Sequence, residues 1–210
     1  MGIKELMTGY GGLMFPLPSI AGSCKGKNIV VCGDASCVWD DLEKFGCADT
    51  STFKGRIKKD GWEFMAINKI GETFPGHLHH WYSNQPNYLN TFIAARRPEY
   101  APEFSPFWVT HSCNSGADYR WPWHGGGTSG LGGTLVAVAL GYDRVMLCGL
   151  PLDDSPHNGE PHWRKSNFTR EASGSINNDQ NTYWKRAIAE GFDGKVKSMS
   201  GRTKEWMGAP

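Results

Sequence analysis

The chain has 210 residues, of which 39% are hydrophobic and 20% are charged, and its formal net charge is +1. This length suits one folded domain, and the balanced charge excludes a global field that would attract nucleic acid or an acidic membrane. No stretch approaches the roughly 18 apolar residues of a membrane span, and no long apolar signal region opens the chain, so a cytoplasmic protein is expected. The six cysteines form no CxxC pair, which favours free thiols.

Residues 1–22 contain several glycines and prolines and have no sustained hydrophobic period, so they are expected to form an irregular N-terminal arm. Residues 23–210 are expected to form a single α/β nucleotide-binding-like domain. Within this domain, the apolar run 28–32 predicts a buried strand, and residues 38–45 predict a short helix after it.

The loop between this strand and helix has the sequence Gly-Asp-Ala-Ser and supplies three candidate ligand-binding residues. Gly33 allows a tight turn, and the carboxylate of Asp34 can accept hydrogen bonds from ribose hydroxyls. Ser36 offers a hydroxyl at the edge of the same site. The alternative is that Asp34 and Ser36 only cap the helix.

Asn68 follows directly on the apolar run 62–67, which predicts the next strand. Open α/β sheets bind ligands at the carboxyl ends of their strands. Asn68 is therefore a further candidate ligand-binding residue.

Three histidines, His77, His79 and His80, crowd together before Trp81 and Tyr82. Two imidazoles on one face of a strand could bind a metal ion. The segment has no aspartate, glutamate or cysteine to complete a ligand set, and the alternative is a strand with a polar edge. No metal ligand is predicted.

A pair of arginines, Arg96 and Arg97, lies in a proline-containing stretch. Their guanidinium groups could reach a phosphate, and the alternative is the solvated end of a helix. The run 107–110 then predicts another short strand.

A glycine-rich loop precedes residues 128–140, where Thr128 and Ser129 can cap a helix that the following small and apolar residues would bury. The first amides of such a helix are unpaired and lie at the positive end of its dipole, so the loop suits a phosphate or another anion. The candidate anion-binding residues are Gly126, Gly127, Thr128, Ser129 and Gly130. The alternative is that the glycines serve only the packing of helix on sheet. Gly133, inside the helix, is expected to tolerate alanine if the packing admits a methyl group.

The helix is expected to end at a left-handed Gly141, and the apolar run 145–148 predicts a further strand. The strands that end at Cys32, Ile67 and Cys148 are almost continuously apolar, which is typical of strands covered on both faces. The fold class expected is therefore α/β: a single Rossmann-like domain with a mainly parallel sheet flanked by helices, in which these three strands are central and adjacent.

After Asp153 the chain becomes polar, and its composition predicts a loop or lid. Asp153, His157 and His162 are the candidate catalytic residues of this segment, because a histidine titrates near neutral pH and a loop can close over a crevice. The alternative is that these histidines are ordinary surface residues. Residues 179–190 then predict a helix, and 194–199 predict an edge strand.

The segments VVCGDAS, AINK and GTSGLGGTLVAVALGYDRVMLCGLPLD together resemble the Rossmann-like core of small bacterial sialyltransferases and of hydroxymethylpterin diphosphokinase-like proteins. Over nearly the whole chain, the sequence also resembles a bacteriophage protein family whose members end in a sequence close to KSMSGRTKEWMGAP. In the sialyltransferases, the first loop and an asparagine after the second strand bind the nucleotide of CMP-sialic acid.

The sialyltransferase resemblance implies nucleotide binding by Gly33, Ser36, Asn68 and the helix start 128–130. Two features depart from that family. The first loop is one residue shorter, with Asp34 where the family has asparagine. By register, Asn178 stands where the family has its catalytic histidine, and an asparagine cannot act as a base.

Three functions follow as hypotheses. The first is a nucleotide-binding transferase, similar to a sialyltransferase-like glycosyltransferase, whose ligand is a nucleotide or nucleotide sugar such as a CMP-linked donor. The second is a non-catalytic phage accessory or host-interaction protein that retains the fold, with Trp121 or Trp123 blocking the crevice. The third is a metal-dependent diphosphokinase or nucleotide hydrolase, in which Asp34, Asp153 and Asp154 hold Mg²⁺. A host protein or a second copy of the chain remains open as a partner, in the host cytoplasm if the protein is encoded by a phage.

Overall fold

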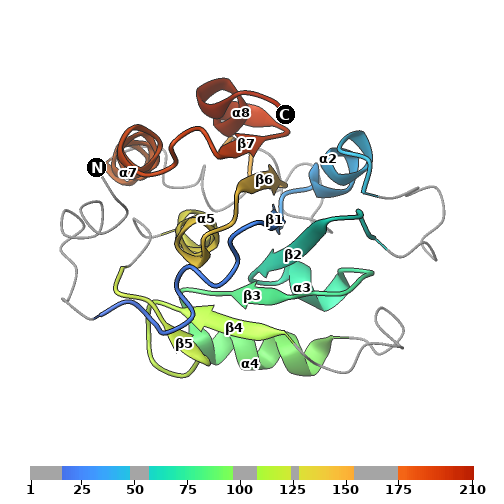
Figure 1. The fold of residues 1–210 in the computed structure, drawn as a ribbon, viewed down its shortest axis with the longest axis vertical. Coiled ribbons are helices and arrows are strands. Elements are labelled where there is room, and N and C mark those ends of the chain that lie inside the picture. The colour runs from blue at the N-terminus through green and yellow to red at the C-terminus, as the bar shows by residue number, and fades with distance from the viewer. Residues whose placement is uncertain (1–15, 48–56, 97–107, 124–127, 154–174) are drawn as a thin grey trace.

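The computed structural model describes residues 16–47, 57–96, 108–123, 128–153 and 175–210, with the backbone alone for 175–180. These residues form one sheet of seven parallel strands in the order β5-β4-β3-β2-β1-β6-β7, with helices on both faces (Figure 1). The predicted fold class, a Rossmann-like α/β arrangement with a parallel sheet, is confirmed.

The elements have the following bounds. The strands are β1 Asn28–Cys32, β2 Trp62–Ile67, β3 His80–Tyr82, β4 Val109–Ser112, β5 Tyr119–Arg120, β6 Arg144–Cys148 and β7 Val196–Ser198. The helices are α2 Val38–Lys44, α3 Ile70–Thr73, α4 Pro86–Ala95, α5 Ser129–Leu140, α7 Ser175–Glu190 and α8 Gly201–Met207.

The three apolar strands β1, β2 and β6 lie at the centre of the sheet, as predicted. Cys32 at the end of β1 is in register with Ala66 of β2 and with Cys148 of β6. Successive residues of β1 point to opposite faces, so Val31 packs on the side of α5 and Val30 on the side of α2. Both faces are therefore covered, which explains why these strands lack polar alternation.

Helix α5 covers one face of the sheet and contacts β1, β2, β3, β4 and β6, while α2 lies on the opposite side (Figure 1). It begins as predicted, with the Thr128 side chain accepting a hydrogen bond from the Leu131 amide, and it ends at Gly141 with φ at +92°. Almost all of its residues are buried. Its apolar character on every side reflects this position between the sheet and α7.

Two glycines let α5 approach the sheet closely. A Cβ at Gly132 would lie 2.5 Å from Cζ of Tyr82, and one at Gly133 would overlap Cδ1 of Ile67. The packing thus leaves no ready space for a methyl group at Gly133, so the condition for its tolerating alanine is not met.

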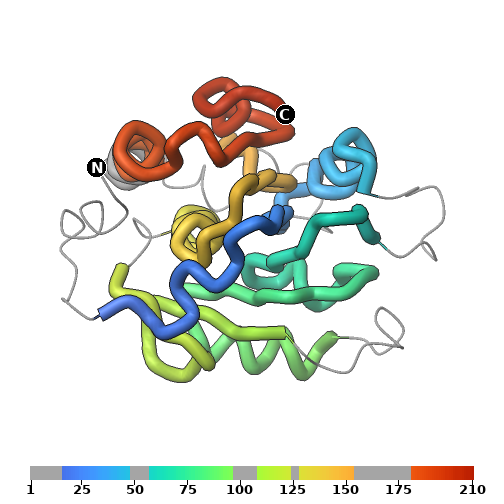
Figure 2. The backbone as a smooth tube through the Cα atoms, viewed as in Figure 1, coloured from blue at the N-terminus to red at the C-terminus, as the bar shows by residue number. Residues whose placement is uncertain are grey.

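The segment before β1 crosses the C-terminal end of α5 (Figure 2). The amide of Gly22 donates to the Ala139 carbonyl at 2.9 Å, and the amide of Cys24 donates to the Leu140 carbonyl at 2.8 Å. Residues 16–22 contain no helix or strand, but Leu17, Ile20 and Ala21 pack against the core. These contacts fix the described part of the expected arm to the domain.

Two elements differ from their predicted bounds. The strand predicted at 107–110 is β4, Val109–Ser112, because its pairing with β3 and β5 sets its ends. The helix predicted at 179–190 begins earlier, at Ser175. The edge position predicted for the last strand is confirmed, since β7 closes the sheet beside β6.

Arg96 neither faces a phosphate site nor forms a solvated helix end, the two roles considered for it. Its guanidinium donates to the Gly71 carbonyl and, at 2.9 Å, to the Gly76 carbonyl, and it stacks over the Trp108 ring. Burial lowers its pKa to about 10. The side chain therefore fastens the loops around α3 to the end of α4, and Arg97 lies outside the described residues.

All six cysteines are free, and five of them are buried. Within the described ranges, no helix has the length and apolar character to cross a membrane.

Replacing Gly132 by alanine is expected to lower the free energy of unfolding by about 1–3 kcal/mol, because the methyl group would overlap the rigid Tyr82 ring. The gain in helix propensity, about 1 kcal/mol, does not reverse this loss. Gly133→Ala is the matched control and should cost less, since its methyl meets chiefly the terminal carbon of Ile67, which can shift. Urea unfolding measures both, and a Gly132→Ala protein as stable as wild type would contradict the packing.

Candidate functional site

The strand order reverses between β1 and β6. From β1 the chain proceeds outward through β2, β3, β4 and β5, and it then returns to add β6 and β7 on the other side of β1. In open parallel sheets, ligands bind at such a switch point, outside the carboxyl ends of the strands. The candidate site is therefore the edge of the sheet that follows Cys32 and Cys148.

The loops after β1 and β6 touch backbone to backbone at this point. The Gly33 amide donates to the Cys148 carbonyl at 2.8 Å, and the Ala35 amide donates to the Gly149 carbonyl at 3.2 Å. A Cβ at Gly149 would lie 2.7 Å from the Gly33 carbonyl oxygen, and Gly149 also has φ at +67°. Only glycine at both positions permits this approach.

Asp41, a buried residue of α2, holds the two loops in place. Its Oδ2 accepts a hydrogen bond from the Gly149 amide at 2.8 Å and another from the Ser200 hydroxyl at 2.7 Å. Ser200 follows β7, so one carboxylate joins α2 to the loops after β6 and β7. Cys37 lies 3.5 Å from the Ser200 hydroxyl, and burial raises the pKa of its thiol to about 11, which keeps it protonated.

Helix α2 has Cys37 as its N-cap, with no capping hydrogen bond from that side chain. Neither Asp34 nor Ser36 therefore occupies the N-cap position itself. Asp34 is half-buried and Ser36 is exposed, and both lie at the carboxyl edge of the sheet.

Asn68 has a left-handed backbone, with φ at +55°, at the end of β2. Its amide donates to the Tyr82 carbonyl at 2.9 Å, and its carbonyl accepts a hydrogen bond from the Trp81 indole at 2.7 Å. Its backbone groups are thus committed to the fold. The half-buried side chain lies at the same edge as the loop after β1.

The start of α5 is linked to the end of β3. The Ser129 hydroxyl accepts a hydrogen bond from the Asn84 amide at 3.2 Å, and Oδ1 of Asn84 accepts one from the Tyr82 hydroxyl at 2.7 Å. The Asn114 side chain donates to the Asn84 carbonyl at 2.6 Å. These bonds bring Ser129 into one polar rim with the residues that follow β3 and β4.

The side chain of Leu150 lies between the first loop and the start of α5. A Cβ at Gly33 would overlap Leu150, and a Cβ at Gly130 would lie 2.9 Å from its Cδ2. Gly33 and Gly130 therefore accommodate a leucine from the loop after β6. A ligand at the switch point would contact Leu150 before it reached either glycine.

Four of the predicted site residues, Gly126, Gly127, His157 and His162, lie outside the described residues, as does Asp154. Their roles stay predictions. Asp153 is half-buried and follows β6 at the same edge as Asp34, Asn68 and Ser129. The parallel register thus places these four residues at one edge of the sheet, and their joint role in a site stays a prediction.

The sequence reading missed Asn84, Asn114, Asp41 and Ser200. Asn84 has a signal in the sequence, because it comes shortly after the strand His80–Tyr82, as Asn68 comes after β2. The three neighbouring histidines instead suggest a metal site. Asp41 carries no such signal. Its importance depends on an amide 108 residues further along the chain.

Trp121 and Trp123 lie after β5, and their proposed blocking role stays a prediction. Both are buried in the core on the α5 side, with their rings 5.1 Å apart. Among the described residues, the exposed large hydrophobic side chain is Tyr88, so no described tryptophan is fully exposed.

A chain of buried hydrogen bonds crosses the α5 side of the sheet, away from the carboxyl edge. The Trp121 indole donates to His111 at 3.1 Å, His111 and His80 lie 2.9 Å apart, and His80 lies 2.8 Å from the Tyr142 hydroxyl. Tyr142 in turn donates to Glu63, which also accepts from Lys27 at 2.8 Å. Together the side chains join β2, β3, β4 and the segments that follow β5 and α5.

The two ends of this chain fix its direction. An indole only donates, so Nδ1 of His111 is an acceptor and its Nε2 carries the proton. That proton is donated to Nδ1 of His80, and Nε2 of His80 then donates to Tyr142. Burial lowers the pKa of His80 to about 4 and that of His111 well below its usual range, so both rings are neutral.

Cys24, Glu63 and His80 have ligand-type atoms within 4.8 Å of one another, and they are the described group that could hold a metal ion. The Tyr142 hydroxyl, however, already bonds to both Glu63 and Nε2 of His80. A metal on that nitrogen would require both histidines to change tautomer, which would leave two N–H groups facing each other between His111 and Trp121. The hydrogen-bond chain and a metal ion here are therefore incompatible.

His77 and His79 do not join His80 in a metal site. Their rings contact each other edge to face at 4.4 Å, and Nδ1 of His79 accepts a hydrogen bond from the Phe64 amide. Of the three histidines, His80 lies in strand β3, which is the alternative considered for this segment, and His77 and His79 precede the strand.

No protein-family model and no curated protein matches the chain. Among solved structures, the chain is similar to the sialyltransferase CstII from Campylobacter jejuni, in complex with the substrate analogue CMP-3FNeuAc, at 12% identity and a TM-score of 0.49. The similarity covers 87% of this chain and 86% of that one. A likeness of this size identifies neither a ligand nor a reaction for the present chain.

The buried histidines predict a loss of stability in acid. The pKa of His80 is about 4 when folded and near 6.5 when unfolded, so between these values the unfolded chain binds more protons and stability falls as the pH decreases. From pH 7 to pH 5, His80 alone should contribute a loss of about 2 kcal/mol. His80→Gln can keep a donor and an acceptor but does not titrate, so urea unfolding should show a smaller loss between the two pH values. An unchanged pH dependence would contradict the neutral, buried state of His80.

Proposed function

We propose that the protein binds a nucleotide or a nucleotide sugar at the carboxyl edge of the sheet and acts as a transferase on that nucleotide-linked substrate. The observation that carries the proposal is the convergence of polar loops at one switch point: the loops that contain Asp34 and Asn68, the start of α5 at Ser129, and Asp153. A crevice at this position, bordered by several polar groups from different strands, is the usual ligand site of open α/β sheets.

The proposed contacts follow from the geometry of the rim. Asp34 and Ser36, in the loop between β1 and α2, accept hydrogen bonds from ribose hydroxyls. Asn68 and Asn84 offer amide groups for a base or a sugar. The phosphate lies toward the N-terminus of α5, where Gly126 and Gly127 are proposed to contribute amides.

The chemical step requires a base or an acid near the donor. His157 and His162, which follow Asp153 in the polar segment, are proposed for this role, since a neutral imidazole can accept the proton of an attacking hydroxyl. A CMP-linked donor remains the first candidate substrate.

Leu150 supports a second candidate function, a non-catalytic binding protein that retains the fold. Its side chain fills the space beside Gly33 and Gly130, where a phosphate would approach a glycine-rich loop most closely. The two functions differ in one experiment. If Leu150 obstructs the site, Leu150→Ala should bind nucleotides more tightly than wild type; if the ligand rests on Leu150, the variant should bind them more weakly.

Asn68→Gly tests the transferase site without straining the backbone, because glycine readily adopts the positive φ of this position. Loss of one hydrogen bond should weaken the binding of the preferred nucleotide about threefold to tenfold. Calorimetric titration with CMP, UDP, GDP, ATP and their sugar derivatives provides the measurement.

The control for Asn68→Gly is Asn90→Ala, which removes an exposed amide side chain of α4 that borders neither the proposed nucleotide site nor the cavity at the amino edge. This variant should bind nucleotides as wild type does. No heat of binding with any of the nucleotides, or equal affinities for wild type and Asn68→Gly, would refute the site.

A further inference from the structure

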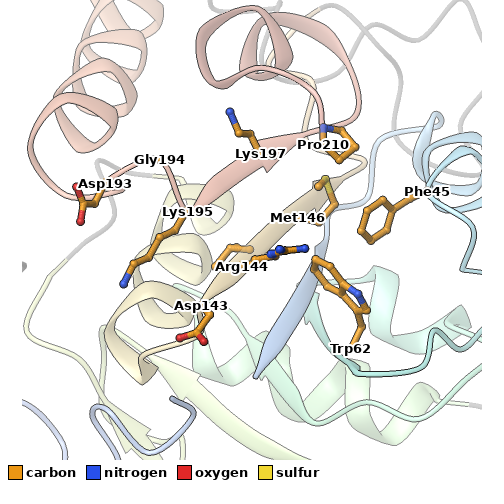
Figure 3. A pocket seen from close by; sticks show the side chains of 11 residues that line it. Phe45, Trp62, Asp143, Arg144, Met146, Asp193, Gly194, Lys195, Lys197 and Pro210 are labelled. Carbon is orange, nitrogen blue, oxygen red and sulfur yellow. The ribbon is translucent and has the colours of Figure 1, made fainter. Parts of the chain in front are cut away.

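The amino edge of the sheet, opposite the proposed nucleotide site, contains a cavity of about 460 Å³. It is bordered by the starts of β2 and β6, the turn before β7 and the end of α2 (Figure 3). This volume falls within the range of about 300–1,000 Å³ that is typical of small-molecule sites.

The cavity exists because no described helix covers this part of the sheet. Helix α2 has only seven residues and ends at Lys44. Beyond it, Met146 of β6 is in register with Lys197 of β7, and Val196 is buried on the opposite, α5 side. Lys197 therefore faces the side of α2 together with Met146. This alternation of buried valine and half-buried lysine is typical of an edge strand with one uncovered face.

One wall of the cavity is aromatic. Phe45 and Trp62 contact each other edge to face, with ring centroids 4.9 Å apart, and both rings are half-buried. Met146 lies beside them (Figure 3). A flat ring of a ligand could stack on one of these aromatic rings and contact the apolar side chain of Met146.

The other wall is cationic. Trp62 and Arg144 are both in register with Asn28, so they lie on the same face, two strands or about 10 Å apart. In Figure 3 the Arg144 side chain extends toward Trp62. A ring that stacks on Trp62 would thus place a substituent within reach of the guanidinium.

The charges of this wall are not neutralised within the described part of the chain. Neither Arg144 nor Lys195 forms an ion pair there, and Lys197 donates to the Met207 carbonyl at 2.9 Å. Asp143 and Asp193 also border the cavity, but Asp143 points away from Arg144 (Figure 3), and basic side chains outnumber acidic ones.

We infer that this cavity is a second binding site, for a small planar aromatic anion: a ring held by Trp62 and Phe45, with a carboxylate or phosphate held by Arg144. Planar guanidinium recognition suits both head groups. The site is separate from the proposed nucleotide site, because it lies at the amino ends of the strands.

Binding can be tested by NMR with ¹⁵N-labelled protein and three probes that share one ring: naphthalene-1-carboxylate, 1-naphthyl phosphate and the neutral naphthalene-1-methanol. The two anions should shift the Trp62 indole signal and the Arg144 and Lys195 amide signals in a saturable way. The alcohol should bind about fivefold more weakly, since it lacks the charge. The tighter of the two anions identifies the head group.

Two variants complete the test. Arg144→Gln should weaken anion binding about fivefold and leave the binding of the alcohol unchanged. Arg202→Gln, which changes an exposed arginine of α8 near the opposite edge, is the matched control and should bind all probes as wild type does. Trp62→Leu, with its fold confirmed by circular dichroism, should weaken all three probes.

Three outcomes would overturn the site: no saturable shift at Trp62, equal binding of the alcohol and the anions, or an equal effect of Arg202→Gln and Arg144→Gln. Shifts centred on Asn68 and Ser129 instead would place the probes at the carboxyl edge and would also exclude a second site.

Discussion

The backbone contact between the loops after β1 and β6 is the constraint on which the candidate site depends. Gly33 and Gly149 approach so closely that neither position admits a Cβ. The Gly149 amide also donates a hydrogen bond to the buried carboxylate of Asp41, which holds the second loop in place. A parallel sheet opens a crevice wherever its strand order reverses. Here the two glycines bring the loops after β1 and β6 into direct backbone contact, and the side chain of Leu150 packs beside Gly33 and Gly130.

The two faces of the sheet differ in how their polar side chains are arranged. On the α5 side, a single directed chain from Trp121 to Glu63 satisfies two histidines and a tyrosine in the interior. Every donor in that chain has an acceptor, which makes the network a structural element and leaves no open position for a metal ion. On the α2 side, the amino ends of β2 and β6 and the turn before β7 border a cavity, where Arg144 is exposed. One fold thus presents a polar rim at one edge and a cationic, aromatic hollow at the other.

The carboxyl and amino edges also differ in the chemical groups that they offer to a ligand. The carboxyl edge offers carboxylate, hydroxyl and amide groups, which suit sugars and bases, whereas phosphate depends on backbone amides of α5. The amino edge offers Arg144 beside Trp62 and Phe45, which suit a charged ring. The nucleotide site and the second site that we propose thus differ in the chemical groups that they present.

The sequence by itself determined the fold class, the three central strands and the buried helix from Thr128 to Gly141, because apolar runs and capping residues are local signals that survive in the folded chain. It also placed Asp34, Asn68 and Ser129 at strand or helix ends, and a parallel register brings such ends to one edge. Only the tertiary structure decided the roles of Asp41, Leu150 and Arg96, since each acts on residues far along the chain. The tautomers of His80 and His111 likewise depend on Trp121 and Glu63, which are joined to them by folding alone.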